Sequence, residues 1–261
     1  MKIFDSHCHL DDKSFAKDLD AVIERARSAG IARMMTIGVN NRTSVLAVSL
    51  AQSHTGIYAS VGIHPHDVKN CSESILQDLI YLAKNEKVCA WGEMGLDFNR
   101  MYSPRKDQEK WLEKQLEIAA ELNLPMIFHE RDSNGRFLEI LQDHEPAAMK
   151  GVVHCFSGNQ NELDQYLAMG LHIGITGILT IKSRGSQLRK LVSGIPADRL
   201  LVETDAPYLV PAPEKNRIRR NEPAFVKSVL LKLAEVRNEN PEDLAEMVWQ
   251  NTCRLYGLEA G

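Results

Sequence analysis

The sequence predicts an α/β fold, a (β/α)8 TIM barrel, from two features of the chain. Eight short β-rich runs alternate with helix-like segments along its whole length, which implies a parallel sheet, and eight strands close such a barrel. Polar residues also collect at the carboxyl ends of many of these runs, where the active sites of barrels lie. An open doubly wound sheet, the alternative fold, would concentrate them at one switch point.

The predicted strands are short runs of mostly apolar residues. They cover residues 3–9, 33–38, 58–64, 88–93, 125–130, 151–156, 171–176 and 200–205. Apolar residues recur at helical spacing within 19–29, 111–122 and 225–233, and a last helix is expected from Pro241 to Gly257. No linker or shift in composition interrupts the 261 residues, so a single domain over residues 1–261 is predicted.

The composition narrows the class of protein. A net charge of −4 argues against a module that only grips nucleic acid, although it allows an enzyme that meets a phosphodiester transiently. No apolar run reaches the ~18 residues of a membrane span, and no signal segment is expected. Five cysteines without a CxxC pair fit reduced thiols. A cytoplasmic protein without a membrane association or a stable protein partner is therefore expected.

Histidines gather at the carboxyl ends of the predicted strands. Six of the nine lie there, namely His7, His9, His64, His66, His129 and His154, while His54, His144 and His172 fall in helix ends or loops and receive no role. A single strand-end histidine is most often a hydrogen-bonded core residue. Four strands that each present one, together with Glu93 and Asp205, indicate a metal site instead.

The ligand set predicts two divalent ions. Residues two apart on a strand point to the same face, so His7 and His9 can hold one ion. His129 and His154 would hold the other, and Glu93 is the best candidate for a carboxylate shared by both, because glycines on either side let backbone and ligand approach closely. So many ligands exceed what one catalytic ion needs, since such an ion keeps positions open for water and substrate.

The chemistry that such a site allows is hydrolysis by metal-activated water. Asp205 would ligate one ion and orient the attacking water. Glu203 is either a supporting base or only a buried, hydrogen-bonded carboxylate. The chain contains no GxSxG elbow and no Walker loop. Cys8 and Cys155 alternate away from the neighbouring histidines, which predicts packed thiols and not nucleophiles.

A long loop is expected after the last strand, over residues 206–223. It carries four cations within six residues, namely Lys215, Arg217, Arg219 and Arg220. In a barrel this loop lies on the catalytic face, where such cations can contact phosphates. The alternative is an ordinary solvated run of charges.

Several motifs in sequence order resemble the TatD-type deoxyribonuclease family. They are Asp5–His9, Gly62–His66, Gly92–Phe98, His129–Asp132, His154–Gly158, Glu203–Tyr208 and Arg219–Pro223. The resemblance runs through nearly the whole chain. Some close members of that family replace the first HxH, which this chain keeps.

The resemblance implies a barrel of the metal-dependent hydrolase type that hydrolyses DNA, often as an exonuclease from the 3′ end, with single-stranded ends as the substrate. It implies support by Mg²⁺ or Mn²⁺, while the histidine ligands also suit Zn²⁺. On the matching positions it places His7, His9, Glu93, His129, His154 and Asp205 at the metals. His64 and Arg131 would lie near the scissile phosphate, and Arg220 is a further candidate for substrate binding.

Two other classes of protein remain open at this point. An amidohydrolase acting on C–N or ester bonds often uses a carbamylated lysine on its fourth strand, where this chain has Glu93 and no lysine. A metal-binding or interaction scaffold would keep the barrel but not the turnover, and the intact ligands at every site argue against it. Both observations favour the phosphodiesterase.

Overall fold

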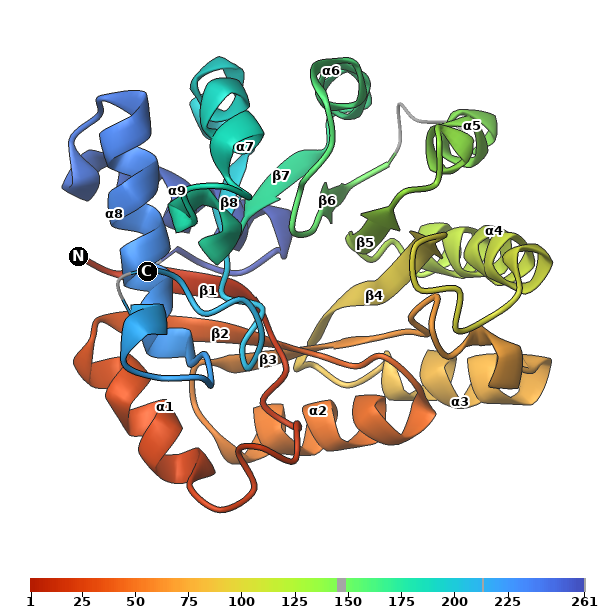
Figure 1. Ribbon diagram of the computed structural model, residues 1–261. Coiled ribbons are helices and arrows are strands. Elements are labelled where there is room, and N and C mark those ends of the chain that lie inside the picture. The colour runs from red at the N-terminus through yellow and green to blue at the C-terminus, as the bar shows by residue number, and fades with distance from the viewer. Residues whose placement is uncertain (145–148, 213, 261) are drawn as a thin grey trace. The chain divides into compact units, whose positions relative to one another are not determined.

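The computed structural model describes residues 1–144, 149–212 and 214–260 (Figure 1). Within these ranges the strands are β1 (Ile3–Cys8), β2 (Ile31–Ile37), β3 (Ile57–Val61), β4 (Val88–Asp97), β5 (Met126–Arg131), β6 (Gly151–Val153), β7 (His172–Ile175) and β8 (Leu200–Val202). The α-helices are α1 (Leu19–Ser28), α2 (Asn41–Ser53), α3 (Glu73–Leu82), α4 (Arg105–Glu121), α5 (Arg136–Asp143), α6 (Gln160–Ala168), α7 (Ser186–Leu191), α8 (Val226–Arg237) and α9 (Pro241–Leu255).

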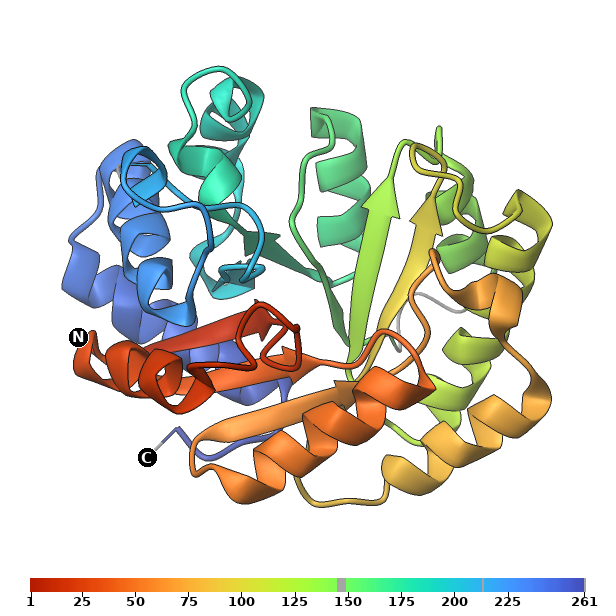
Figure 2. The same ribbon diagram turned by 60° about the horizontal axis from the view of Figure 1, so that its bottom comes forward.

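The eight predicted strands are confirmed, and they follow one another in sequence order in the sheet. The pairs β1–β2, β3–β4, β4–β5, β5–β6 and β7–β8 are parallel. Figure 2 shows β4 (yellow) and β5 (light green) as long neighbouring arrows, and the two strands also lie next to each other in Figure 1. Parallel strands joined by helices are the pattern of the (β/α)8 class, so the predicted fold class is confirmed.

Four strands end three or more residues away from the predicted end, and one of them is β3, which ends at Val61 and not at residue 64. β4 continues to Asp97 because, after an irregularity between Trp91 and Met94, it pairs again with β5. β6 ends early, at Val153, and Cys155 just beyond it has a φ of 49°. β8 also ends early, and Asp205 has a φ of 57°. Both values are left-handed and end the extended backbone.

Contacts divide the chain into two compact units. One consists of Met1–Thr36, Cys155–Gln160 and Ile173–Gly261, and the other of Ile37–His154 and Asn161–His172. We call them unit 1 and unit 2 and describe each by itself. The prediction of a single domain stays a prediction.

The core of unit 1 joins its last helix to its first strand. The ring of Phe4 on β1 lies 6.1 Å from the rings of both Trp249 and Tyr256. All three side chains are buried, and Trp249 belongs to α9. The predicted last helix is therefore confirmed, although it ends at Leu255, two residues earlier than expected.

In unit 2 a buried amide side chain fixes the segment just after β3. Gln115 of α4 accepts the backbone N–H of Ile63 at 2.8 Å and donates to its carbonyl oxygen at 3.0 Å. The same side chain accepts the indole N–H of Trp91 on β4. Since His64 follows Ile63 directly, α4 positions a residue of the candidate site.

Two smaller expectations also have outcomes. His172 begins β7 and so does not lie in a helix end or a loop. None of the helices in the described part of the chain combines the length and the apolar character needed to cross a membrane.

Candidate active site

Three of the predicted metal ligands meet in unit 1. His7 lies on β1, His9 just beyond it, and Asp205 follows β8. The Asp205 carboxylate Oδ1 lies 3.2 Å from His9 Nε2 and 3.8 Å from His7 Nε2. Backbone bonds hold this arrangement, because Asp205 N–H donates to the His7 carbonyl and His9 N–H donates to the Ala206 carbonyl. Two imidazoles and one carboxylate form a nitrogen and oxygen donor set that suits a divalent ion.

A buried carboxylate on β1, that of Asp5, is bonded next to the donor set of His7, His9 and Asp205. The Asp5 carboxylate accepts the hydroxyl of Thr204 at 2.6 Å and its backbone N–H at 2.8 Å. Burial raises the pKa of Asp5 to about 8, against the opposing effect of the Thr204 bonds. These contacts tie β1 to the segment that carries Asp205.

Glu203 lies fully buried in the same unit. It accepts the backbone N–H of Cys155 at 2.6 Å and the hydroxyl of Ser6 at 3.3 Å. A Cβ on Gly174 would come within 2.6 Å of this carboxylate, so the glycine leaves the space that Glu203 fills. The contacts match the buried, hydrogen-bonded carboxylate among the two expected roles. A catalytic role for Glu203 stays a prediction.

Unit 2 brings three histidines from three strand ends around one carboxylate. Glu93 Oε1 lies 2.8 Å from His129 Nδ1, 3.5 Å from His64 Nε2 and 4.0 Å from His154 Nε2. Glu93 and His154 are almost completely buried. A Cβ on Gly95 would overlap the carbonyl oxygen of His129, so only glycine lets β4 approach β5 this closely. The predicted ligands Glu93, His129 and His154 therefore do converge.

Asp97 was not among the site residues predicted from the sequence, and His66 was given no role. Asp97 Oδ2 accepts His66 Nε2 at 2.7 Å and His129 Nε2 at 3.2 Å. Burial acts to raise the pKa of Asp97, but the hydrogen bonds from His129 and His66 outweigh it and hold this pKa well below its usual range. The sequence did contain a signal for Asp97. Glu93 and Asp97 are four residues apart on one strand, so their side chains share a face.

Asp97 also orients His129. With Nε2 bonded to Asp97, His129 presents Nδ1 to Glu93. Burial would lower the pKa of His129, yet the bonds with Asp97 and Glu93 raise it to about 9. A carboxylate on the far nitrogen of an imidazole is the usual way in which a metal-binding histidine is held. The carboxylates of Asp97 and Glu93 therefore favour a positive charge between them. A bound cation would supply such a charge.

His64 also belongs to the cluster around Glu93. Its Nε2 lies 3.2 Å from His129 Nδ1, and ligand atoms of His64, His66 and His129 all lie within 4.8 Å of one another. Burial lowers the pKa of His64 to about 4, although the Glu93 charge opposes this. The imidazole is therefore neutral at pH 7, which is the form that binds metals.

The two predicted substrate-binding arginines lie in different surroundings. Arg131 ends β5 and is exposed. Arg220, in unit 1, donates to both oxygens of Asp18 at 2.7 and 2.8 Å and to Glu222 at 2.8 Å. Arg220 thus joins the loop after β8 to the residue before α1. Contact of either arginine with a phosphate stays a prediction.

The thiols follow the prediction only in part. Cys8 is fully buried and donates to the Met35 carbonyl, whereas Cys155 is partly exposed, with its sulfur 3.4 Å from the Thr176 hydroxyl. Burial raises the pKa of Cys8 well above its usual value, which keeps this thiol protonated and unreactive.

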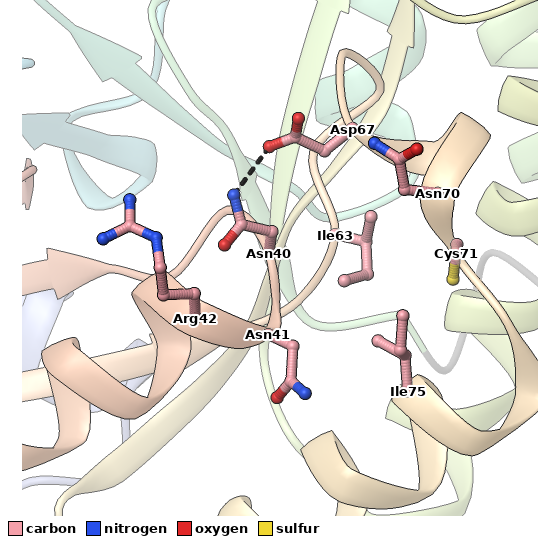
Figure 3. A pocket seen from close by; sticks show the side chains of 8 residues that line it. All are labelled: Asn40, Asn41, Arg42, Ile63, Asp67, Asn70, Cys71 and Ile75. Atoms are coloured by element: carbon pink, nitrogen blue, oxygen red, sulfur yellow. Dashed lines mark hydrogen bonds between the residues drawn. The ribbon is translucent and has the colours of Figure 1, made fainter.

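A cavity of about 220 Å³ lies in unit 2 at the start of α2 (Figure 3). Its lining consists of Asn40, Asn41, Arg42, Ile63, Asp67, Asn70, Cys71 and Ile75. Asn40 donates to Asp67 across it at 2.8 Å. Ile63 belongs to the motif Gly62–His66 that was quoted from the sequence, and it directly precedes His64.

Comparison with known proteins adds an independent observation. Residues 4–257 match the family model described as TatD related DNase. The "3′-5′ ssDNA/RNA exonuclease TatD" of Pantoea vagans is 42% identical over 259 residues, which cover 98% of this chain and 100% of that protein. The protein with the same description from Klebsiella pneumoniae is 40% identical, and the alignment covers 98% of each chain.

Solved structures agree with the sequence relatives. The TatD homologue YjjV from Escherichia coli matches with a TM-score of 0.91 and 30% identity over 98% of each chain. A protein from Saccharomyces cerevisiae described as an uncharacterized amidohydrolase matches with a TM-score of 0.86, but at 23% identity this likeness shows the fold alone. The match of the family model and the identity to full-length relatives together show that this chain belongs to the TatD-related DNase family.

Proposed function

We propose that this protein is a metal-dependent 3′–5′ exonuclease that hydrolyses phosphodiester bonds at single-stranded ends of DNA. Membership of a DNase family makes it a hydrolase of nucleic acid. The observation that carries the proposal furthest is the Glu93 cluster, in which one buried carboxylate oxygen has three imidazole nitrogens within 4.0 Å. The direction of digestion and the single-stranded substrate rest on the descriptions of the relatives, which also name RNA.

Two divalent ions are part of this proposal, with Mg²⁺ or Mn²⁺ expected and Zn²⁺ also suited to the histidines. One donor set is His7, His9 and Asp205, and the other is Glu93, His129 and His154. When bound, such ions lower the pKa of water and stabilise the leaving oxygen. The position of Glu93 as a ligand shared by both ions stays a prediction from the sequence.

The chain's own residues have separate tasks in this proposal. Asp205, in contact with His9, orients the attacking water and receives its proton. Glu203 holds the backbone of Cys155 in place and serves as a supporting base. His64 and Arg131 bind near the scissile phosphate. Five free cysteines fit the reducing cytoplasm that we also propose as its location.

The test uses purified protein and single-stranded DNA labelled at its 5′ end, with Mg²⁺, Mn²⁺ or Zn²⁺. We expect progressive shortening from the 3′ end. Glu93→Gln keeps the shape of the side chain but removes its charge. It should lower the rate by more than about 100-fold, beyond the loss typical of a residue that only orients a ligand.

Glu121→Gln, at the exposed end of α4, is the matched control and should retain full activity. DNA loss that persists in Glu93→Gln would identify a contaminating nuclease. Hydrolysis of amide or ester substrates in place of DNA would support the amidohydrolase alternative.

A further inference from the structure

Tyr102 is an exposed aromatic residue beside the Glu93 cluster in unit 2. Its side chain is 55% exposed, and the preceding Met101 is 41% exposed. The Tyr102 ring lies 4.8 Å from the ring of His66 in an edge-on arrangement, with an interplanar angle of 71°. His66 in turn shares Asp97 with His129. An aromatic surface therefore reaches solvent within two side chains of a predicted metal ligand.

The loop that carries Tyr102 is fastened on both sides. Before it, the Asp97 carboxylate accepts the backbone N–H groups of Asn99 and Arg100 at 3.0 and 2.7 Å. After it, the buried Ser103 donates to the His66 carbonyl at 2.9 Å and accepts the Lys69 N–H at 3.1 Å.

Further contacts add to this rigidity. Gln108 of α4 donates to the Ser103 carbonyl at 2.9 Å. Met101 has a φ of 52°, a left-handed conformation that is uncommon for a residue other than glycine. These contacts hold the loop in place, so the exposed ring of Tyr102 has a defined position.

The exposed ring of Tyr102 offers an aromatic surface to a ligand next to His66. Single-stranded nucleic acids are bound by such rings, since every nucleobase has a flat face that stacks on an aromatic side chain. The two groups match in shape and in polarity, and stacking requires no particular base.

We propose that Tyr102 is a stacking platform for a nucleobase of the substrate, next to the nucleotide whose phosphate is cleaved. This inference rests on the proposed nuclease function and deepens it. Tyr102 positions the strand, while the cluster around Glu93 carries the chemistry. Because a base in a duplex already stacks on its neighbours, the platform also gives a physical reason for a preference for single strands.

The test compares the wild type with Tyr102→Ala and Tyr102→Phe on single-stranded DNA. Tyr102→Ala should lower kcat/KM by about 5- to 150-fold, chiefly through KM, which is the range for loss of one base–aromatic stack. Tyr102→Phe keeps the ring and should stay within about twofold of the wild type. Tyr81→Ala is the matched control, because Tyr81 on α3 is 75% exposed and belongs to no part of the site.

An abasic substrate separates stacking from a merely structural role. Oligonucleotides that lack the base at each of the last four positions in turn are compared between the wild type and Tyr102→Ala. When the missing base is the one that stacks on Tyr102, the wild type and Tyr102→Ala should have the same kcat/KM. An equal loss on every substrate would mean that Tyr102 only supports His66, and it would overturn the proposal, as would an unchanged kcat/KM.

Equilibrium binding gives the same comparison without turnover. The Kd of a fluorescein-labelled single strand is measured by anisotropy without added metal. Tyr102→Ala should raise this Kd by a similar factor, and an unchanged Kd contradicts the stacking platform. Failure of the wild type to cut DNA would count against the nuclease function alone, so the two failures can be told apart.

Discussion

At the scale of single residues, the most informative side chain is Asp97. It was assigned no role from the sequence, yet its carboxylate holds both His66 and His129 by their Nε2 atoms. His129 can then offer Nδ1 to Glu93. The geometry of the cluster therefore depends on a residue behind it, as is common for metal-binding histidines.

Asp97→Asn should weaken metal binding and activity without removing any proposed ligand. The amide keeps the size of the carboxylate but loses the charge that fixes the tautomer of His129. We expect a loss of about 10- to 100-fold in Mn²⁺ affinity and in kcat/KM, measured by metal titration and DNA hydrolysis. The matched control is Asp143→Asn at the exposed end of α5, which should change neither quantity. Wild-type affinity in Asp97→Asn would show that His129 is held by other contacts.

At the scale of elements, the loop after β8 contains two kinds of arginine. Arg220 is engaged by Asp18 and Glu222, and Arg25 of α1 binds the same two acids. We call these four residues the α1 clasp. Arg217 and Arg219 are exposed to solvent. From the sequence all three loop arginines were candidates for phosphate contact, and Arg220 alone was also named for substrate binding. The structure instead gives Arg220 structural partners and leaves Arg217 and Arg219 open to a ligand.

The α1 clasp should stabilise the fold in a pH-dependent way. The hydrogen bond from Arg220 is the main cause that lowers the pKa of Asp18 to about 2. A carboxyl whose pKa is lower in the folded state contributes stability above its unfolded value of about 3.9, and this contribution is lost as the pH falls through the folded value.

Arg220→Ala should therefore have a lower urea midpoint than the wild type at pH 5 to 7, and the gap should close toward pH 2. Arg219→Ala, an exposed neighbour, is the control and should follow the wild type. A gap that does not depend on pH would assign the effect of Arg220 to packing, for instance to its position 4.9 Å from the Phe15 ring.

A separate prediction concerns the binding of nucleic acid by Arg217 and Arg219. If Arg217 and Arg219 each meet a phosphate, the double alanine variant should flatten the salt dependence of single-strand binding. The slope of log K against log salt should fall by about 1.4, since each phosphate contact on a single strand contributes about 0.7. An unchanged slope would return both residues to the solvated-charge interpretation, and the urea midpoint should not change in either case.

At the scale of the whole molecule, the sequence predicts strands better than their ends. All eight strands were recognisable, because buried parallel strands read as apolar runs separated by helical periodicity. The continuation of β4 to Asp97 was not, since it depends on re-pairing with β5 after an irregularity. The early ends of β6 and β8 come with left-handed backbone at Cys155 and Asp205, which no alternation pattern announces.

The site divides in the same way between local pattern and tertiary structure. His7 and His9 were paired by strand alternation alone, and Glu93, His129 and His154 by their places at strand ends. The anchoring of Arg220 and the exposure of Tyr102 required the fold, because both depend on segments distant in the chain. Candidate metal ligands at strand ends can therefore be predicted from one sequence. The side chains that hold or surround them cannot.

The last prediction concerns metal content, which tests both donor sets at once. We expect about two ions per chain in the wild type by elemental analysis after dialysis against Mn²⁺, as a paired hydrolytic site requires. His9→Ala and His129→Ala each remove a ligand from one set and should each retain about one ion. His54→Ala, at the end of α2, is the control and should retain both.

Thermal unfolding supplies the second readout of metal binding. A ligand that binds only the folded state at 100 times its Kd stabilises it by about 2.7 kcal/mol, and in a chain of this size each kcal/mol raises Tm by about 2–4 °C. Removal of metal with EDTA should therefore lower Tm by several degrees per ion in the wild type. In His9→Ala and His129→Ala, each expected to keep one ion, the drop should be about half as large. If His9→Ala lost all bound metal, the two sets would not bind independently, and a ligand common to both ions, the position predicted for Glu93, would then account for the coupling.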